Sequence, residues 1–474
     1  MLVSAPKPSP RLQTIFALGV VALSVLSVEA QQTTPGRTTE AGEASIKGEL
    51  KFLVISQSPF PSANRVKYNC GLITRAYPKK ECEPYNFQPV TDALASFPII
   101  WQPATIVPED SNAQAKWAAI QPSVPNIPPK GTLEGNFEGL NYPADDPDCW
   151  WTNTKCNNPK TGGIPADVFT MPEPRTLGYG FDDGPNCSHN AFYDYLRSQN
   201  QRATMFYVGS NVMDWPLEAQ RAVADGHEIC IHGWSHRYMT GFESPDAFAE
   251  LYYSVRAFIP MQAVKIATGV TPTCWRPPYG DVDDRIRAIA HGLGLRTVLW
   301  DYDSQDWQVG ATAGVTSETV DKEYQVLIDD AKKGKFNNVG AMLLMHEINE
   351  FTMTEAMKMY PKLKEAFQHI VPVCVGLNIT QPYVENSVTM PNFAQYIAGT
   401  GSTLVKNSTN AVTVTATASA SSTSSPSTTG DAPGATPQTG DASRLQWMNG
   451  MGGIQLIVAL VLGFVCAATL GLPN

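Results

Sequence analysis

The chain has 474 residues, of which 43% are hydrophobic and 16% charged, and its formal net charge is -10. This length and composition predict one large folded domain with extensions and exclude a chain that is disordered throughout. The absence of a basic stripe excludes the electrostatic pattern typical of nucleic-acid-binding proteins, so no nucleic-acid partner is expected.

Residues 1–30 are predicted to be a secretory signal peptide. Lys7 and Arg11 precede the apolar run TIFALGVVALSVL, and small residues follow up to Ala30. The run is short for a membrane anchor, and this order of basic, apolar and small residues is typical of a cleaved signal. Residues 31–174 follow as a loop-rich N-terminal extension without a recognisable catalytic motif, which is interpreted as a covering lobe or a propeptide.

Residues 175–375 alternate between strand-like and helix-like segments. Apolar runs predict strands over 176–181, 203–208, 228–233, 274–280, 295–303, 340–346 and 370–375. Amphipathic stretches predict helices over 189–200, 216–226, 246–268, 283–294, 317–334 and 354–370. This alternation is typical of βα units around a parallel sheet. We therefore predict an α/β fold, a complete or incomplete (β/α) barrel, with its chemistry at the carboxyl ends of the strands.

The C-terminal part is predicted to be an unfolded stalk followed by a processed tail. After a C-terminal extension over 376–400, residues 401–443 are rich in Ser, Thr, Ala and Pro, as in an O-glycosylated stalk. Residues 444–474 contain an apolar, uncharged run without basic stop-transfer residues, which is typical of a glycosylphosphatidylinositol (GPI) attachment signal that is removed. The candidate attachment residues are Gly440, Ser443 and Asn449.

Cysteines and sequons also indicate an extracellular protein. If Cys466 leaves with the tail, eight of the nine cysteines remain, an even number that indicates disulfides but leaves their connectivity open. The candidate pairs are two local loops, Cys70–Cys82 and Cys149–Cys156, and a long bridge, Cys187–Cys374. N-glycosylation sequons occur at Asn186, which lies beside the candidate site, and at Asn378 and Asn407.

Polar residues follow several of the predicted strands. The segments are FDDGP with Asp182 and Asp183, HGWSH with His232 and His236, RPPYG with Arg276, DSQDW with Asp303, Asp306 and Trp307, and LLMH with His346. Because parallel strands bring their carboxyl ends to one edge, we expect these side chains to converge.

Three of these residues form a candidate metal site. Adjacent carboxylates repel each other unless a cation lies between them, and a divalent metal at Asp183 would supply that charge. His232 and His236 could join it, because a four-residue spacing places two imidazoles on one face of a helical turn. Two His and one Asp leave open positions for water and substrate, as in a hydrolytic zinc site. The alternative is that these residues only form a turn or a helix cap.

The remaining polar residues form a candidate acid–base pair. Asp182 is the predicted general base, held ionised and oriented by Arg276. His346 is the predicted general acid, oriented by Asp306. The alternatives are a surface ion pair for Arg276 and an ordinary core histidine for His346.

Residues 175–375 resemble the polysaccharide deacetylases, the NodB-type carbohydrate esterases. The five motifs of that family occur here in the same order, as FDDGP, HGWSH, RPPYG, DSQDW and LLMH. With the signal, stalk and anchor patterns, the chain resembles the fungal cell-surface chitin deacetylases of that family. The resemblance implies a distorted (β/α) barrel of seven or eight strands and a divalent metal, Zn²⁺ or Co²⁺. It also implies an oxyanion contact from the backbone N–H of Tyr279, and an acetyl pocket lined by Trp307 and Leu344.

The expected reaction is metal-dependent hydrolysis of N-acetyl groups of chitin, giving chitosan and acetate. Chitin or N-acetylglucosamine oligomers and cell-wall polysaccharide are the expected partners of a monomeric, GPI-anchored protein at the plasma membrane and cell wall. An acetyl-xylan or other polysaccharide deacetylase of the same fold, or a non-catalytic chitin-binding wall mannoprotein, are the alternatives. The chain departs from the motifs at Gly180, where Thr is usual, and at Met345 and Glu347, where Leu and Asp are commoner.

Overall fold

The computed structural model describes residues 37–46, 80–255, 263–400 and 404–405. The predicted signal peptide and attachment signal lie outside these residues, as does the predicted stalk except for Leu404–Val405. Cys70, Asn407, Gly440, Ser443 and Asn449 also lie outside them. Among the helices of the described residues, none is long and apolar enough to cross a membrane.

A curved parallel sheet lies at the centre of the described residues, in the strand order β5-β4-β3-β2-β1-β7-β6, with β8 beside β1. The strands are β1 (Thr176–Gly184), β2 (Thr204–Tyr207), β3 (Glu228–Ile231), β4 (Cys274–Trp275), β5 (Arg296–Thr297), β6 (Tyr302–Asp303), β7 (Ala341–Leu344) and β8 (His369–Val371). These eight strands, with helices between them, confirm the predicted distorted (β/α) barrel.

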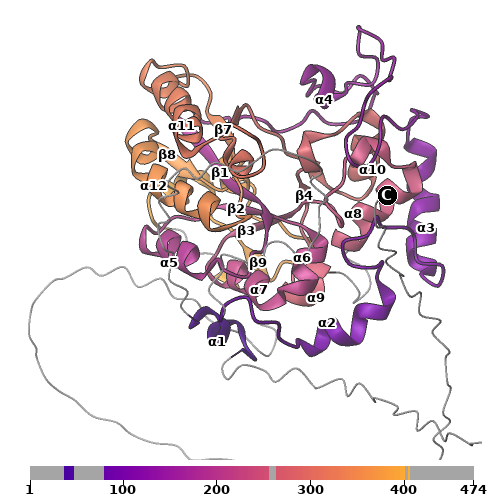
Figure 1. Ribbon diagram of the computed structural model, residues 1–474, viewed down its shortest axis with the longest axis horizontal. Helices are drawn as coiled ribbons and strands as arrows, with labels where there is room; N and C mark the ends of the chain where they lie inside the picture. The colour runs from indigo at the N-terminus through magenta and orange to yellow at the C-terminus, as the bar shows by residue number, and fades with distance from the viewer. Residues whose placement is uncertain (1–36, 47–79, 256–262, 401–403, 406–474) are drawn as a thin grey trace, which may run out of the picture. The chain divides into compact units, whose positions relative to one another are not determined.

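Helices follow most strands and cover the sheet (Figure 1). They are α5 (Asn190–Ser198), α6 (Gly209–Asp214), α7 (Pro216–Ala224), α8 (Ser244–Val255), α9 (Ala263–Thr268), α10 (Asp284–Gly292), α11 (Ser317–Lys332), α12 (Glu350–Ala366) and α13 (Val373–Gly376). After the barrel come α14 (Phe393–Ile397) and an antiparallel pair, β9 (Val388–Thr389) and β10 (Leu404–Val405). The helix α12 packs against both α5 and α11, and α8 packs against α10.

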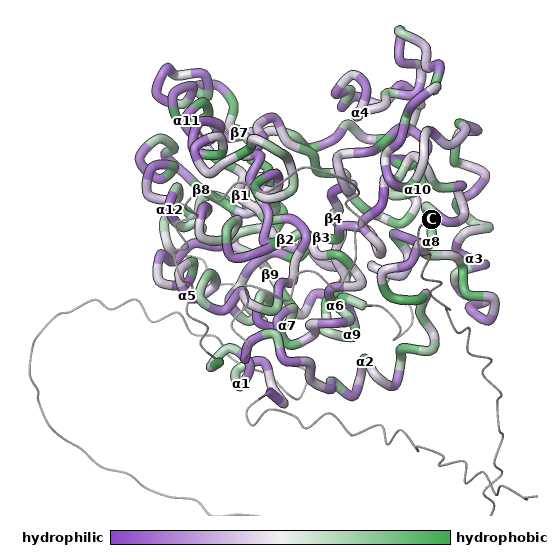
Figure 2. The backbone as a smooth tube through the Cα atoms, in the orientation of Figure 1, coloured by the Kyte–Doolittle hydropathy of each residue, from purple (hydrophilic) through white to green (hydrophobic). Residues whose placement is uncertain are grey.

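Local sequence explains most of these elements. In α11, Val320, Tyr324, Leu327 and Ile328 recur at helical spacing and are buried, and hydrophilic and hydrophobic residues alternate along this helix in Figure 2. By contrast, nearly every residue of β1 is buried, as expected for a strand covered on both faces.

One predicted strand is divided in the structure. The run 295–303 forms β5 at its start, which pairs with β4, and β6 at its end, which pairs with β7. Because β4 and β7 lie on opposite sides of β1 in the sheet order, this run connects the two ends of the sheet. Between β5 and β6, Val298 instead forms a parallel bridge with Val168 of the N-terminal extension. The two ends of the sheet therefore approach each other, and Val168, which lies outside the barrel, pairs with the segment that joins them.

Several other predicted boundaries are wrong. The run 274–280 is extended only over β4, since the prolines of RPPYG cannot donate to a strand ladder. The run 370–375 turns helical after β8, and α6 was not predicted. The predicted helix 246–268 contains α8 and α9, and the residues between them are not described.

The N-terminal extension packs onto the barrel from residue 80 onward. Its helices are α2 (Gln88–Ala93), α3 (Ser111–Ile120) and α4 (Trp151–Thr154), and α1 (Glu40–Ala44) lies against α7. Phe97 stacks on Trp234 and Trp117 packs on Phe248, so the extension and the barrel share one hydrophobic core.

Three disulfides connect described cysteines: Cys82–Cys187, Cys149–Cys156 and Cys230–Cys274. The short loop Cys149–Cys156 matches its predicted pairing. The predicted pairs Cys70–Cys82 and Cys187–Cys374 are wrong, because Cys82 and Cys187 bond to each other and Cys374 is a buried free thiol.

The position of Cys374, in α13, gives the physical reason. Its backbone N–H donates to Glu228 at the start of β3, whereas Cys187 lies beyond the carboxyl end of β1. The two cysteines therefore lie toward opposite edges of the parallel sheet, out of reach of a disulfide.

Candidate metal and catalytic centre

The predicted site residues come together at the carboxyl edge of the sheet. Asp182 and Asp183 end β1, and His232 directly follows β3. Arg276 directly follows β4, and His346 lies two residues after β7. Since these strands are parallel, residues separated by more than 160 positions in the chain share one edge of the barrel.

Asp183, His232 and His236 form a compact cluster whose ligand atoms lie within 4.8 Å of one another. Oδ1 of Asp183 lies 2.9 Å from Nε2 of His236 and 3.3 Å from Nε2 of His232. Asp183 has φ 72° and His236 has φ 54°, in the left-handed region that non-glycine residues seldom adopt. Backbone strain of this kind collects at functional sites, where the surrounding structure holds it.

The chemistry of this donor set fits a divalent cation. Nδ1 of His232 lies 2.7 Å from the carbonyl oxygen of Arg276, which can only accept, so Nδ1 carries a proton and Nε2 is the ring nitrogen that faces Asp183. Burial alone would raise the pKa of Asp183, but the charge of His236 and His232 holds it well below its usual range. Oδ1 of Asp183 is buried without a hydrogen bond from the described residues. Two imidazoles and one carboxylate are a donor set typical of zinc.

Asp182 lies next to this cluster and is bound by Arg276. Nη1 of Arg276 donates to Oδ1 of Asp182 at 2.7 Å, and both side chains are buried. The guanidinium packs 3.9 Å from the ring centroid of Phe206, which fixes its orientation. Oδ2 of Asp182 lies 3.7 Å from Nε2 of His232, so the second oxygen faces the donor cluster.

His346, two residues after β7, forms a parallel backbone bridge with Asp182. Burial alone would lower the pKa of His346, but the charge and hydrogen bond of Asp306 outweigh it and raise the pKa to about 9. Because Asp306 accepts from Nδ1, the other ring nitrogen, Nε2, remains to donate a proton. A carboxylate and an imidazole with a raised pKa thus both lie near the donor cluster.

Two aromatic side chains at the site are exposed. Tyr279 is 45% and Trp307 42% exposed, whereas Leu344, at the end of β7, is only 4% exposed. The ring of Tyr279 stacks on Tyr238 and lies 4.6 Å from His236 between centroids. The apolar surface near the site therefore comes from loop residues, Tyr279 and Trp307, and from Leu344 at the end of a strand.

Glu347 is a buried acid that the sequence analysis noted only as a departure from the motif. It accepts hydrogen bonds from the Tyr193 hydroxyl at 2.9 Å and from the backbone N–H of Asn186 at 3.1 Å. Burial raises its pKa to about 8. A Cβ at Gly184 would collide with its carboxylate, so the glycine of FDDGP makes room for Glu347.

The sequon residues that the structure describes have different surroundings. Nδ2 of Asn186 donates to the Ile348 carbonyl at 2.7 Å, and its Oδ1 accepts from Ser188. That amide is engaged inside the fold, which argues against a glycan at Asn186. Oδ1 of Asn378 accepts from the backbone N–H of Phe393 at 3.0 Å, and Asn378 has a left-handed backbone at φ 57°.

Comparisons with known proteins agree with these motifs. A family model described as polysaccharide deacetylase matches residues 171–298. The chain is 51% identical over 324 residues to chitin deacetylase 2 of Cryptococcus neoformans var. grubii, covering 67% of this chain and 70% of that protein. It is 44% identical over 319 residues to the chitin deacetylase of Amylomyces rouxii, covering 65% of this chain and 73% of that protein.

Solved structures that match cover less of the chain. The chitin deacetylase of Colletotrichum lindemuthianum aligns with a TM-score of 0.38 and 22% identity, over 44% of this chain and 91% of that one. The peptidoglycan deacetylase PdaC of Bacillus subtilis aligns with a TM-score of 0.36 and 25% identity, over 44% of this chain and 92% of that one.

Proposed function

Since the chain belongs to the polysaccharide deacetylase family, we propose that it removes acetyl groups from N-acetylglucosamine units of chitin, giving chitosan and acetate. The observation that carries this proposal is the convergence of Asp183, His232 and His236 beside Asp182 and His346. Amide hydrolysis needs these elements together: activation of water, charge stabilisation at the carbonyl, and a proton for the leaving nitrogen.

We propose that Asp183, His232 and His236 bind Zn²⁺, with Co²⁺ as the alternative. When bound there, a divalent ion supplies Lewis acidity toward the acetyl carbonyl and lowers the pKa of water. The mixed nitrogen and oxygen donors suit both metals, and metal analysis of the purified protein distinguishes them.

Asp182 is the proposed general base, which takes a proton from the attacking water through the oxygen that faces the donor cluster. Arg276 keeps Asp182 ionised and oriented through its 2.7 Å hydrogen bond. The backbone N–H of Tyr279 is the proposed donor to the oxyanion of the tetrahedral intermediate. Trp307 and Leu344 are proposed to contact the acetyl methyl group.

His346 is the proposed general acid. It protonates the leaving nitrogen, a step that the reaction needs because an amide anion is a very poor leaving group. Asp306 holds the imidazolium that donates this proton, with its Nδ1 toward Asp306 and its Nε2 toward the site.

The sequence patterns support a cell-surface location. We propose that the protein is a secreted monomer with a GPI anchor, which meets chitin and other wall polysaccharides at the plasma membrane and cell wall. Release of the protein from intact cells by a phosphatidylinositol-specific phospholipase is the expected result. Retention of all the protein on the cells after that treatment would contradict the lipid anchor.

The decisive experiment compares acetate release from chitin oligomers and from acetylated xylan. We expect release from chitin oligomers, and at least a hundredfold lower kcat for Asp182→Asn with an unchanged metal content. Release from xylan alone would establish an O-deacetylase of the same fold. Binding to chitin without any acetate release would instead support a non-catalytic wall protein.

A further inference from the structure

The side chain of Trp151 connects the N-terminal extension to the loop that carries Tyr279 and to the segment between β5 and β6. Trp151 begins α4 and is 4% exposed. A Cβ at Gly280 would collide with its ring, so Trp151 lies directly against the residue that follows Tyr279. The centroid of the Trp151 ring also lies 4.6 Å from that of Trp300, a residue between β5 and β6.

Hydrogen bonds fix this contact in position. The backbone N–H of Trp151 donates to the Val282 carbonyl at 3.0 Å. The fully buried carboxylate of Asp281 accepts from Nε1 of Trp150 at 2.8 Å and from the Thr152 hydroxyl at 2.6 Å. Three consecutive residues of α4 and its cap thus hold the two residues that follow Gly280.

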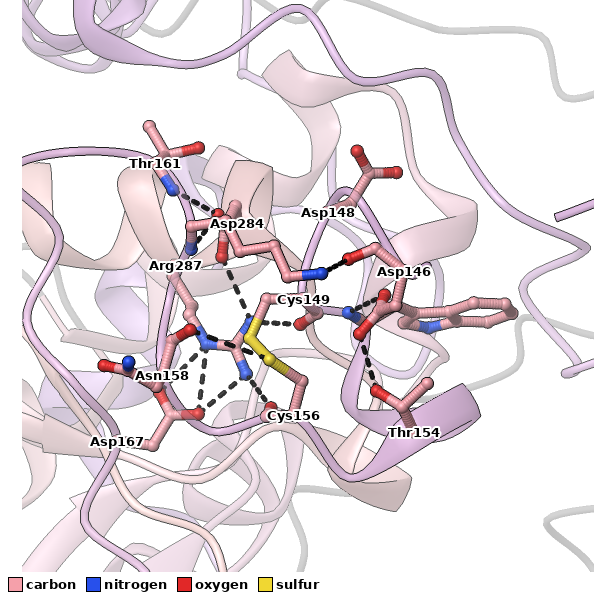
Figure 3. The surroundings of a disulfide bond; sticks show 12 residues. Asp146, Asp148, Cys149, Thr154, Cys156, Asn158, Thr161, Asp167, Asp284 and Arg287 are labelled. Carbon is pink, nitrogen blue, oxygen red and sulfur yellow. Dashed lines mark hydrogen bonds and ion pairs between the residues drawn. A yellow bond between two sulfur atoms is a disulfide. The ribbon is translucent and has the colours of Figure 1, made fainter. Parts of the chain in front are cut away.

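A single guanidinium holds both ends of the disulfide loop that contains α4 (Figure 3). Arg287, in α10, donates to the Cys149 carbonyl at 2.5 Å and to the Cys156 carbonyl at 2.8 Å. The same group forms a buried ion pair with Asp167 at 2.7 Å. Asp284 accepts from the backbone of Lys160 and Thr161, so the chain after the loop is held to α10 as well.

The outer face of Trp151 is also covered. Nζ of Lys155 lies 3.4 Å from the centroid of the Trp151 ring, a cation–π contact inside the same disulfide loop. The ring is thus enclosed by Gly280, Trp300 and Lys155. This enclosure leaves Trp151 little freedom to move, and the loop that packs on it little freedom as well.

The loop at Tyr279 needs such support. Tyr279 has φ 59°, a left-handed conformation that a non-glycine residue keeps only where neighbouring structure imposes it, and Gly280 follows with φ 69°. We propose that Trp151 is a positioning residue, which holds the backbone N–H of Tyr279 in the orientation for the oxyanion. This inference rests on the proposed function and assigns a catalytic contribution to the N-terminal extension.

The test compares Trp151→Ala and Trp151→Phe with Trp117→Ala. Trp117 is a matched control, because it also lies in the extension and packs on an aromatic ring, Phe248, away from the loop. We expect kcat on chitin oligomers to fall roughly 10- to 100-fold in Trp151→Ala, with KM and metal content unchanged and partial recovery in Trp151→Phe. Trp117→Ala should keep kcat even where its melting temperature falls. Equal kcat values for Trp151→Ala and the wild type would overturn the inference.

A double-mutant cycle tests whether the contact is direct. Gly280→Ala places a methyl group against the Trp151 ring, so its effect on kcat should be smaller in the Trp151→Ala background, where the ring is gone. Equal effects of Gly280→Ala in both backgrounds would show that the two residues act independently, against the proposal.

Amide hydrogen exchange over residues 279–283 provides a readout that does not depend on activity. We expect faster exchange in Trp151→Ala than in the wild type, and no change in Trp117→Ala. A wild-type protein that releases no acetate would refute the proposed function, yet unchanged protection in Trp151→Ala would refute only the positioning role.

Discussion

Asp306 binds His346 through both of its carboxylate oxygens. Nδ1 of the His346 ring lies 2.6 Å from Oδ1, and the backbone N–H of His346 donates to Oδ2 at 3.0 Å. The two bonds set the ring orientation and the protonation state together, because the buried carboxylate stabilises the imidazolium.

Asp306→Asn should therefore move the alkaline limit of activity. With the pKa of His346 raised to about 9, the proposed acid stays protonated at neutral pH, and kcat/KM should fall only as the pH rises through about 9. Loss of the Asp306 charge should lower that pKa and shift the fall in kcat/KM toward the neutral range. A pH profile of kcat/KM measures the shift, and an unmoved alkaline limb would contradict the role of His346 as the acid.

The same pair should contribute to stability with a defined sign. A histidine whose pKa is raised in the folded state adds stability that is complete below its unfolded value of about 6.5 and is lost as the pH rises through about 9. The free energy of unfolding of the wild type should thus fall between pH 7 and 10 by more than that of Asp306→Asn. Parallel curves for the two proteins would exclude the coupling.

Metal removal should destabilise the protein through the donor cluster alone. A ligand that binds only the folded state at a hundred times its Kd adds about 2.7 kcal/mol, so chelation should lower the melting temperature by several degrees. Asp183→Asn should show little further decrease with chelator, because it already lacks one donor. The measurement is a thermal scan with and without EDTA, and an equal decrease in both proteins would place the metal elsewhere.

Acid should weaken the fold through a buried neutral histidine. Burial, aided by Arg202 and Arg221, lowers the pKa of His227 to about 3, while Nδ1 accepts from the backbone N–H of Ala203 at 3.1 Å. A depressed histidine pKa contributes stability that is complete above about 6.5 and is lost as the pH falls toward 3, at about 1.4 kcal/mol per pH unit.

The variant His227→Gln tests this contribution, because the glutamine side-chain oxygen can still accept a hydrogen bond from the backbone N–H of Ala203. Its free energy of unfolding should decline less steeply between pH 6.5 and 4 than that of the wild type, as chemical denaturation at several pH values would measure. If the two slopes coincide, His227 is not the group that titrates.

Of the two disulfides of the N-terminal extension, one should contribute more to stability and the other more to kcat. Cys82–Cys187 closes a separation of 105 residues, for which chain entropy predicts about 5 kcal/mol, against about 2.5 kcal/mol for the 7-residue separation of Cys149–Cys156. Cys82→Ser/Cys187→Ser should therefore lower the melting temperature more. Cys149→Ser/Cys156→Ser should lower kcat more, because its loop carries Trp151, and the reverse ranking of kcat would oppose that assignment.

The sequence determined the alternation of strands and helices, and the positions of polar residues after the strands. These follow from local periodicity and from residue types: near-continuous apolar runs are typical of buried parallel strands, and Asp182, Asp183, His232 and His346 stand where such runs end. Parallel strands place all such ends at one edge, so the convergence of the site could be predicted without knowledge of any long-range contact.

Only the tertiary structure decided how distant segments meet. Cys187 bonds to Cys82 rather than Cys374 because Cys187 follows the carboxyl end of β1 whereas Cys374 lies beside the start of β3, and no spacing in the chain reports that difference. The division of 295–303 and the contact between Trp151 and Gly280 also depend on packing across the whole fold. Local sequence determines what each segment tends to form, whereas burial of apolar surface between segments determines which residues touch.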